Sequence, residues 1–484
     1  MQPTTRAVDR GTVGLEGASR DTYAGDPVSA SGVPTPAEYC LFTSIGPKLM
    51  TRLLVEKTPS STLPQKKIYI LIRSRIIPKI VRWTFLLFVF TLPFETLDIE
   101  AIHGTSSARI VGLLCFSICL FYSKVCFRRP PQALWCFAGY VFVYVLMGLL
   151  TPEKVAGQFI GGLQTFIQLL VLCWISCTLL QEEKFARYTL LTFSIATLLS
   201  ATGMLLGLPG FAQNMGEGRW SAMGFNPNGL AYTMGMAAQA LIGFGIDHTH
   251  RKRWRRVTFL VLSLLPLAAM VYTGSRGGML ASMTGITVYA LPYCRSKRKM
   301  MAILGIAIAI VSVIYLVLND QSTMSRFERT YEQGETAGRN TIFAAAVEMI
   351  SEKPLLGWGN MAGPELGSRT GKWSRDTHNL FLHLLTTTGL LGTIPFLIGL
   401  GLCVRAAWTA RVCSLGLLPL VWLVTMMVVS MSSTPIADKQ FWLALALSLA
   451  SGAFTVKQRM RKNLLIRTIL QLSQKRNVVH TTGF

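Results

Sequence analysis

The stretch SRDTHNLFLHLLTTTGLLG, residues 374–392, joins a polar start to a long apolar continuation. Arg375, Asp376, His378 and Asn379 stand at its beginning, and the segment that follows stays largely apolar to residue 402. A helix needs about 20 apolar residues to cross the hydrocarbon core of a bilayer. The stretch therefore predicts a membrane span, and its polar start is either a helix cap or part of a site.

Apolar segments of this kind recur along most of the chain. Hydrophobic residues make up 51% of the sequence and charged residues 14%, whereas soluble domains carry roughly 25% charged residues. The pattern predicts an all-α, polytopic bundle of about twelve transmembrane helices. The predicted spans are residues 80–97, 108–124, 133–150, 156–180, 187–208, 228–246, 257–273, 278–293, 301–318, 380–402, 412–431 and 440–455.

Basic residues gather between these segments and give the chain a net charge of +24. The runs at residues 66–82, 248–256, 294–300 and 456–467 each lie beside an apolar segment. Nucleic-acid binding is one interpretation, but the positive-inside rule explains the same placement, and we expect no nucleic-acid partner. The rule puts both termini in the cytoplasm and makes residues 319–379 the only long loop on the outer, periplasmic side.

This topology divides the chain into three parts. Residues 1–64 are rich in Gly, Ser, Thr and Pro and are expected to form a disordered cytoplasmic extension. Residues 65–455 form the transmembrane domain, and residues 456–484 form a basic cytoplasmic tail. The tail alternates basic and apolar residues, which favours a helix on anionic lipid of the inner leaflet, with docking of a partner protein as the alternative. The ten cysteines show no disulfide or zinc pattern and are expected to pack as small side chains.

The outer loop contains a helical pattern at GRNTIFAAAVEMISEKPLLGWG, residues 338–359. Ile342, Ala346 and Met349 fall on one face of this helix, and Pro354 ends the pattern. A short helix lying on the outer membrane surface fits these residues. A helix packed on the ends of the spans fits them equally well.

Three arginines and a histidine also occur on the predicted outer side, where the positive-inside rule disfavours arginine. Arg219 lies in the loop at residues 209–227, Arg276 in the tight turn TGSRGG, and Arg339 at the start of the loop helix, while His378 opens the tenth span. Arginine offers a planar fork of donors that suits phosphate oxygens. Together these residues indicate a site for a phosphate or diphosphate group.

Each of these four residues also has a structural explanation. Arg219 could be a rim charge that reaches water, and Arg276 could bond carbonyl groups at the span ends. Arg339 could pair with Glu335, and His378 could cap its helix.

Two further groups of polar residues need an interpretation. The stretch FNPNGLA, residues 225–231, starts a span. The main role expected for Asn228 is to cap that helix, and contact with a sugar is its second candidate role. Asp98 and Glu100, with help from His103, could ligate a hard metal ion. Two carboxylates make a weak metal site, so we expect neither a metal nor a cofactor. No nucleotide-binding motif occurs in the sequence.

The segments SRGG (275–278), AGRNTIFAAAVEMISEKPLLGWGNM (337–361) and THNLFLHLLTTTGLLG (377–392) resemble the O-antigen ligase and polymerase superfamily of bacterial envelope glycosyltransferases. The resemblance covers roughly residues 210–430. It implies a GT-C-like inner-membrane enzyme that takes a glycan from a polyprenyl diphosphate carrier on the outer leaflet. A ligase passes the glycan to lipid A–core in lipopolysaccharide biosynthesis, and a polymerase passes it to another carrier-linked repeat.

Carried over to this chain, the resemblance implies that Arg276 and Arg339 hold the diphosphate, with Arg219 as a third arginine. His378 would act as the base or orienting group for the acceptor hydroxyl. Arginines that bind the leaving diphosphate would stabilise the charge that develops on it, and direct attack would invert the anomeric centre.

Three further residues are candidates around this site. Asp376 is a candidate for orienting the imidazole of His378, and Asn379 and Asn228 are candidates for contacting the substrate. The implied partners are the carrier-linked donor, a lipid A–core or glycan acceptor, and membrane lipids.

A transporter and a non-enzymatic subunit for polysaccharide assembly are competing functions. Few ionisable residues lie in the middle of the spans, and no paired broken helices in two repeated halves are visible in the sequence, which disfavours a transporter. Between the two transferases the sequence favours the ligase, because the single long loop directly precedes His378.

Overall fold

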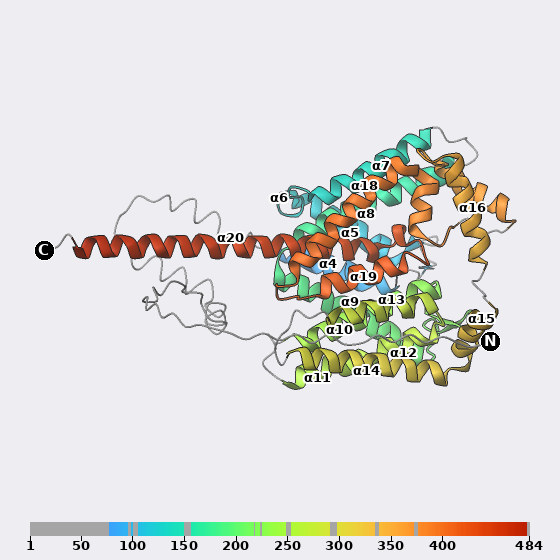
Figure 1. Ribbon diagram of the computed structural model, residues 1–484, viewed down its shortest axis with the longest axis horizontal. Helices are drawn as coiled ribbons and strands as arrows, with labels where there is room; N and C mark the ends of the chain where they lie inside the picture. The colour runs from blue at the N-terminus through green and yellow to red at the C-terminus, as the bar shows by residue number, and fades with distance from the viewer. Residues whose placement is uncertain are drawn as a thin grey trace, which may run out of the picture. The chain divides into compact units, whose positions relative to one another are not determined.

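The computed structural model describes residues 77–94, 98–99, 105–149, 156–216, 218–222, 225–247, 253–290, 298–333, 338–371 and 376–481. They belong to one compact unit, Arg75–Phe484, and are almost entirely helical (Figure 1). The predicted extension at residues 1–64 lies outside the described residues.

The helices follow one another closely along the chain. The α-helices are α4 (Lys79–Thr91), α5 (Ser107–Phe121), α6 (Ser123–Cys126), α7 (Gln132–Leu149), α8 (Ala156–Leu179), α9 (Glu183–Leu205), α10 (Pro227–Ile246), α11 (Arg253–Leu262), α12 (Leu264–Tyr272), α13 (Arg276–Thr287), α14 (Arg298–Asn319), α15 (Gln321–Gln333), α16 (Arg339–Glu352), α17 (Ala362–Thr370), α18 (Leu380–Ala410), α19 (Leu418–Val429) and α20 (Lys439–Thr481). Short 3-10 helices are η1 (Leu92–Phe94), η4 (Val288–Ala290), η5 (Gly359–Met361) and η6 (Pro435–Ala437).

Strands occur only as two small hairpins in the described residues. Strand β1 (Asp98–Ile99) pairs antiparallel with β2 (Thr105–Ser106), and β3 (Gln213–Asn214) pairs antiparallel with β4 (Trp220–Ser221). Both hairpins lie in connections that the topology assigns to the outer side. The fold is therefore all-α in its framework.

A helix occupies each of the predicted spans. Within the described residues, six helices are long and apolar enough to cross a membrane, namely α7, α8, α9, α10, α18 and the continuous stretch Arg253–Tyr272. Helices α14 and α15 qualify as a seventh only together, and they are bent by 89° at their junction. The class of an all-α membrane protein is confirmed, while the number of about twelve spans stays a prediction.

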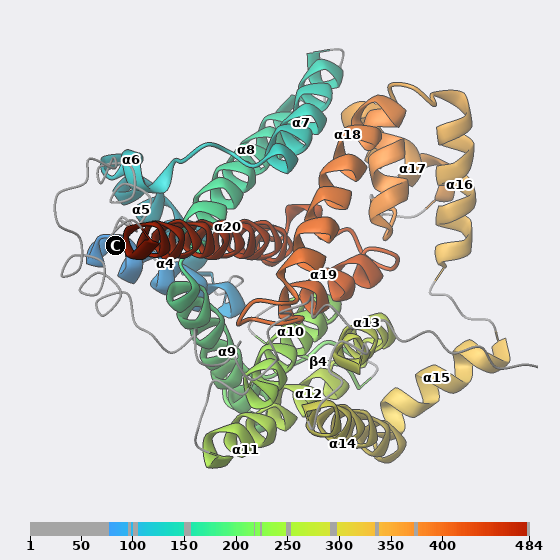
Figure 2. The ribbon, with the colours of Figure 1, turned by 60° about the vertical axis from the view of Figure 1, so that its left-hand side comes forward.

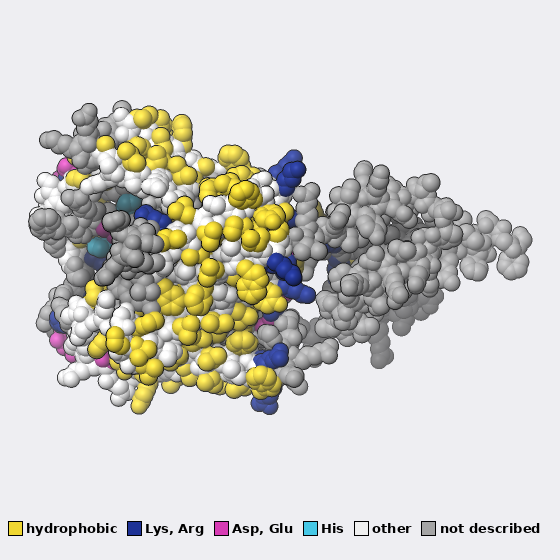
Figure 3. Space-filling model, turned by 180° about the vertical axis from the view of Figure 1, so that it is seen from behind, with side chains coloured by type: hydrophobic (Ala, Val, Ile, Leu, Met, Phe, Trp, Pro, Cys, Tyr) yellow, Lys and Arg dark blue, Asp and Glu magenta, His cyan; other side chains and the backbone are white. Residues whose placement is uncertain are grey.

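Segments that the sequence assigns to the inner side meet at one end of the helices. Arg82 donates to Glu182 at 2.8 Å, and Arg187 pairs with Asp247 at 2.7 Å. Figure 3 shows Lys and Arg side chains along one end of a broad hydrophobic surface, and Asp, Glu and His side chains together with further Lys and Arg at the other. The two predicted sets of connections thus lie at opposite ends, and which end faces the cytoplasm stays a prediction.

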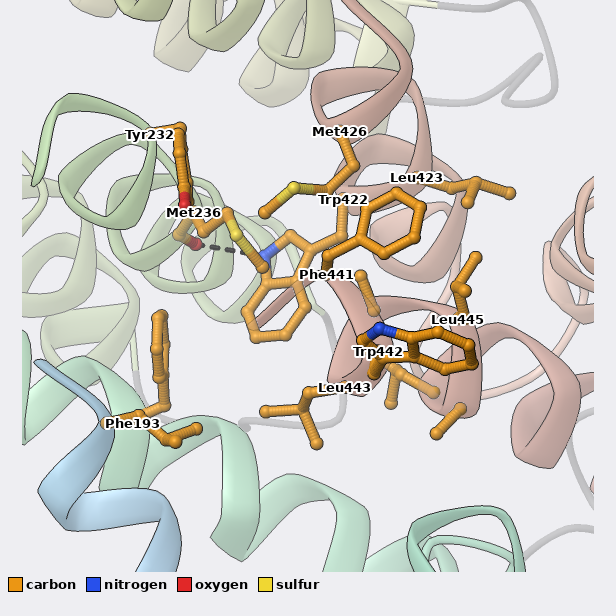
Figure 4. Close-up of a cluster of buried hydrophobic side chains, with 14 of the residues drawn as sticks. Phe193, Tyr232, Met236, Trp422, Leu423, Met426, Phe441, Trp442, Leu443 and Leu445 are labelled. Carbon is orange, nitrogen blue, oxygen red and sulfur yellow. Dashed lines mark hydrogen bonds between the residues drawn. The ribbon is translucent and has the colours of Figure 1, made fainter. Parts of the chain in front are cut away.

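The core centres on α19, which lies between α10, α13, α18 and α20 (Figure 2). Trp422 of α19 is fully buried and donates its indole N–H to the carbonyl of Met236 in α10 at 2.9 Å (Figure 4). Phe193 of α9 contacts the same indole edge-on, with ring centroids 5.3 Å apart. A buried indole needs a partner for its N–H, so this hydrogen bond fixes the rotation of α19 against α10.

Small residues bring α10, α13 and α19 close together. A Cβ on Gly235 of α10 would lie 1.8 Å from the hydroxyl oxygen of Ser282 in α13. A Cβ on Gly285 of α13 would lie 2.0 Å from the hydroxyl oxygen of Thr425 in α19. Such contacts between small side chains are the usual way in which helices pack tightly in lipid. They place the starts of α10 and α13 and the end of α19 side by side.

Helix α18 is broken at Gly389. This residue has φ 57° and ψ −160°, a conformation that is essentially confined to glycine. The turn PLLGWG of the outer loop, residues 354–359, inserts at the break. Leu390 donates its backbone N–H to Pro354 O at 2.8 Å and Leu391 donates to Leu355 O at 3.1 Å. The turn thus satisfies donors that the broken helix would leave unpaired inside an apolar environment.

The fit of this turn is close on both sides. A Cβ on Gly389 would lie 2.3 Å from the carbonyl carbon of Leu355, and a Cβ on Gly357 would lie 2.7 Å from the backbone nitrogen of Gly389. Gly357 also has a positive φ of 69°. Trp358 donates its backbone N–H to Thr386 O at 2.7 Å. No side chain larger than hydrogen fits at either glycine without moving the backbone.

The outer-loop helix α16 is packed rather than isolated. Its buried residues Ile342, Ala345, Ala346 and Met349 form a small core with Ala362 and Leu366 of α17, and Leu382 of α18 packs against them. Arg369 of α17 binds Glu352 and Glu365 at 2.7 and 2.8 Å and lies against Trp358. The packing of α16 on the start of α18 agrees with the second interpretation of the sequence pattern. Its position on the membrane surface stays a prediction.

Substitution of Gly389 by alanine should weaken the fold. The new Cβ would displace the carbonyl of Leu355, and alanine would add about 1–3 kcal/mol of backbone strain. Thermal unfolding of the detergent-solubilised protein, followed by fluorescence-detected size exclusion, measures the loss. Gly401→Ala in the same helix is the matched control, since a Cβ there meets no atom within 4 Å. Equal unfolding temperatures for the two variants would contradict the proposed role of the break.

Candidate functional site

A pocket lies where α10 and α13 begin and α19 ends. Its cavity volume is about 20 Å³, which is room for a water molecule. Two of the predicted site residues, Asn228 and Arg339, line the pocket. Ser275 and Gly277, on either side of the predicted Arg276, line it as well. The lining residues are Asn228, Tyr232, Ser275, Gly277, Gly278, Arg339, Val429, Ser432 and Ser433.

The SRGG motif builds one wall of this pocket. Ser275 caps α13, since its hydroxyl accepts the N–H of Gly278 at 3.3 Å. A Cβ on Gly277 would lie 2.6 Å from the hydroxyl oxygen of Ser432, and a Cβ on Gly278 would lie 2.5 Å from Cβ of Ala231. The two glycines therefore let the start of α13 touch both α10 and the loop after α19. The sequence motif is explained here by close helix approach.

Arg339, the first residue of α16, also lines the pocket. Gly338 precedes it with a positive φ of 71° and caps the helix without a side-chain hydrogen bond. The Arg339 side chain is half-buried, and burial lowers the pKa of its guanidinium. Among the described residues no hydrogen-bond or ion-pair partner of Arg339 is found, and Glu335, its predicted partner, lies outside them. A partly desolvated arginine at a pocket wall favours an anionic ligand.

Arg219 and Arg276 make structural contacts next to the pocket. Arg219 donates to Thr273 O at 3.2 Å and to the side-chain oxygen of Asn228 at 3.1 Å. Arg276 donates to Arg326 O of α15 at 2.6 Å. The bond of Arg276 to a carbonyl oxygen agrees with its structural explanation, whereas Arg219 binds protein groups that its explanation as a rim charge did not include. The contacts hold the two cations beside the pocket wall.

Asn228 does not cap α10, although the sequence pattern predicts that it does. The residue that caps α10 is Asn226, whose side chain accepts the backbone N–H of Asn228 at 2.9 Å. Pro227 occupies the first helical turn, so the cap falls on the residue before it. The carboxamide oxygen of Asn228 instead accepts from Arg219 and from Ser275 at 2.8 Å. The prediction of Asn228 as the cap was wrong, and its side chain lies in the pocket.

His378 has an unusual backbone. With φ 49° it is the only non-glycine residue with a positive φ in the part of the chain that the structure describes. Asp376 supports this conformation, because its carboxylate accepts the backbone N–H of His378 at 3.2 Å. The other carboxylate oxygen lies 3.4 Å from Nδ1 of the imidazole. Asp376 is therefore in place to orient the imidazole although it is only two residues away.

A single loop connects His378 to the pocket. Thr434 donates to the carboxylate of Asp376 at 2.5 Å, and Leu380 donates its backbone N–H to Ser430 O at 2.8 Å. Ser432 and Ser433, between these two contacts, line the pocket. His378 itself does not line the pocket in this conformation. Residues 430–434 thus bind the residues on either side of His378 and also line the pocket.

Asn379 acts as a helix cap in the structure. Its carboxamide oxygen accepts the N–H groups of Phe381 and Leu382 at 2.9 and 3.1 Å, and its nitrogen donates to Met431 O at 3.3 Å. The side chain is buried. Through these three contacts Asn379 fixes the start of α18 against the loop after α19. A role of Asn379 in contacting substrate stays a prediction.

The sequence patterns did not single out Tyr232, which lines the pocket, or Asp438, which binds Tyr232. The Tyr232 hydroxyl lines the pocket and donates to the carboxylate of Asp438 at the start of α20. Burial, together with the charge of Asp376, raises the pKa of Asp438, while the bond from Tyr232 opposes the shift. Asp376 became a candidate because it is an acidic residue just before an apolar segment. Asp438 has the same position in the sequence, so the same pattern indicates it.

The predicted metal ligands cannot be placed beside this pocket. The side chains of Asp98, Glu100 and His103 lie outside the described residues. Among the described side chains, no group of three or more His, Cys, Asp or Glu residues has the spacing to hold a metal ion. The expectation of a metal-independent site stays a prediction.

Residues 259–397 match the family model described as O-antigen ligase. The matched region includes SRGG, the outer loop, His378 and the break at Gly389. The match confirms the resemblance of this part of the chain to the O-antigen ligase and polymerase superfamily. The comparison with curated protein sequences gives no match.

The left-handed backbone of His378 predicts how substitutions there affect stability. His378→Asn should unfold at nearly the wild-type temperature, because asparagine tolerates this conformation. His378→Val should lose about 1–2 kcal/mol, since a β-branched side chain does not. Thermal unfolding of the two purified variants measures the difference. If valine is tolerated as well as asparagine, the conformation is not required by the fold.

Proposed function

Because residues 259–397 match the O-antigen ligase family, we propose that this protein is a membrane glycosyltransferase of the ligase type. It would move a glycan from a polyprenyl diphosphate carrier to a hydroxyl group of lipid A–core. The reaction would occur at the periplasmic face of the bacterial inner membrane, with both termini in the cytoplasm. The observation that carries the proposal is the pocket that the half-buried Arg339 lines together with Ser275 and Asn228.

The diphosphate of the donor would occupy the Arg339 side of the pocket. Arg339 would bind it directly, and Arg219 and Arg276 would contribute positive charge from the adjacent turn. When the bond between the anomeric carbon and the diphosphate oxygen breaks, the electron pair stays with the diphosphate. Fixed cations stabilise that charge more strongly in the transition state than in the bound donor, which lowers the barrier.

The acceptor would approach from the side of His378. Its hydroxyl oxygen would attack the anomeric carbon, and the imidazole would take the hydroxyl proton. Asp376, 3.4 Å from Nδ1, would hold the ring in the orientation needed for this transfer. One displacement of this kind inverts the anomeric centre and needs neither a covalent enzyme intermediate nor a metal ion.

Purified protein reconstituted with a polyprenyl diphosphate-linked glycan and lipid A–core tests this proposal. Arg339→Gln should slow transfer by about 10²–10³-fold, as expected for loss of one charge-stabilising donor. His378→Asn, which keeps the backbone conformation, should slow transfer by about 10²–10⁴-fold. Arg109→Gln is the matched control, because Arg109 is an exposed arginine at the predicted outer start of α5.

Two results would contradict the assignment. Full activity of a folded Arg339→Gln or His378→Asn variant would exclude that residue from the site. Equal loss with Arg109→Gln would mean that any outer arginine matters through general charge. Substrate flux in proteoliposomes without a covalent product would instead indicate a transporter.

A repeat polymerase is the second candidate on the same fold. The observation in its favour is Arg326, which adds a cation beside Arg219. A Cβ on Gly274 would lie 3.8 Å from the Arg326 guanidinium and 3.4 Å from the Arg219 side chain. An additional cation suits an acceptor that also carries a diphosphate.

A deletion strain distinguishes the two transferases. Loss of a ligase should leave lipid A–core without any repeats, whereas loss of a polymerase should leave lipid A–core with a single repeat. Gel analysis of the lipopolysaccharide measures the difference. A single-repeat product would overturn the ligase and favour the polymerase.

A further inference from the structure

A groove lies at the end of the helices opposite to the candidate site. It is formed by α7, α18 and α20 and has a volume of about 290 Å³. The pocket of the candidate site adjoins the start of α20, whereas this groove contacts α18 and α20 several turns further along. The lining residues are Gln132, Ala133, Leu402, Arg405, Ala406, Thr409, Leu449, Gly452 and Val456.

The walls of the groove are apolar. Ala133, Leu402, Leu449 and Val456 come from all three helices and present small or aliphatic side chains. The floor is formed where α18 and α20 touch, since a Cβ on Gly452 would lie 2.9 Å from Cβ of Ala406. A trough of this kind between helices suits a hydrocarbon chain.

The rim of the groove is polar and positively charged. Arg405 is exposed, and its guanidinium has no hydrogen-bond or ion-pair partner among the described residues. Gln132 and Thr409 add further polar groups, and none of the lining residues is acidic. The rim therefore favours an anion.

Further cations surround the rim. Lys457 follows Val456 on α20, and burial together with the charges of Arg128 and Arg461 lowers the pKa of its ammonium group. Two acidic residues of this end are already paired, Glu182 with Arg82 and Asp247 with Arg187. The positive charge at the groove is thus not neutralised by these carboxylates.

Exposed tryptophans mark the depth of the groove in the membrane. Trp135 is 68% exposed one turn after Gln132, and Trp408 is 42% exposed immediately before Thr409. Arg411 stacks on Trp408 with its guanidinium carbon 4.5 Å from the ring. Exposed tryptophan beside arginine is typical of the level of the lipid headgroups. The rim therefore lies at headgroup level and the apolar walls at acyl-chain level.

We propose that this groove binds an anionic phospholipid, with its phosphate on Arg405 and an acyl chain along the apolar walls. The charge of the rim selects a negative headgroup, and basic pockets between membrane helices are suited to such lipids. A helix of a second copy would leave Arg405 facing apolar side chains, which is costly. The inference does not depend on the transferase chemistry, since the site and the groove lie at different ends of α18 and α20.

Native mass spectrometry of the full-length, delipidated protein tests the proposal. The probe is phosphatidylglycerol, and phosphatidylcholine with the same acyl chains is the zwitterionic comparison. The wild type should retain phosphatidylglycerol in preference to phosphatidylcholine. Arg405→Gln should bind phosphatidylglycerol about five-fold more weakly, as expected for loss of one cation at a membrane surface. Arg405→Lys should keep most of the preference.

Arg411→Gln is the matched control, because Arg411 lies at the same end of α18 but outside the groove. It should leave the retention of phosphatidylglycerol unchanged. Equal retention of both lipids by the wild type would overturn the proposal, as would equal losses in the Arg405→Gln and Arg411→Gln variants. A dimer that carries no lipid and dissociates in Arg405→Gln would instead make the groove an interface between copies. Since Arg405→Lys keeps the charge, loss of the preference for phosphatidylglycerol in that variant as well would overturn the assignment of the phosphate to this cation.

Discussion

The turn at residues 354–359 fills a break in α18, and the position of the outer loop depends on this contact. A broken helix leaves backbone N–H groups without partners, and each one costs several kcal/mol in hydrocarbon. Here the carbonyls of Pro354 and Leu355 accept those N–H groups. The turn and the break are therefore stable only together. Because the turn directly follows α16, it also fixes the helix whose first residue is Arg339.

The loop after α19 joins the two halves of the candidate site. Its residues hold the start of α18 through Asn379 and Leu380 and support Asp376 through Thr434. The same loop lines the pocket through Ser432 and Ser433. A displacement of this loop would change the pocket and the surroundings of His378 at once. This coupling offers a physical route by which the two predicted binding regions could respond to each other.

Charge is distributed differently at the two ends of the helices. At the basic end, Arg82 and Arg187 are paired with carboxylates, and Trp135 and Trp408 are exposed beside further cations. At the other end, Arg339 is half-buried at a pocket wall. The first arrangement suits a lipid surface. The second suits a single bound anion, since desolvation strengthens its interaction with the guanidinium.

The amino-acid sequence was sufficient for the helical class, for a helix in each predicted span and in the outer loop, and for placing Arg339 near the turn that contains Arg276. Apolar length, loop charge and local motifs carry that information because they act within a short stretch of chain. The sequence did not reveal that Asn226 rather than Asn228 caps α10, or that Tyr232 meets Asp438. The second contact joins residues far apart in the chain.

The break at Gly389 shows why only the tertiary structure could decide such points. Within TTTGLLG, residues 386–392, Gly389 is compatible with a continuous apolar helix. Its left-handed conformation follows from the turn that approaches from another segment and leaves no room for a Cβ. Local pattern thus determined where the helices run, and packing between distant segments decided which side chains share a pocket.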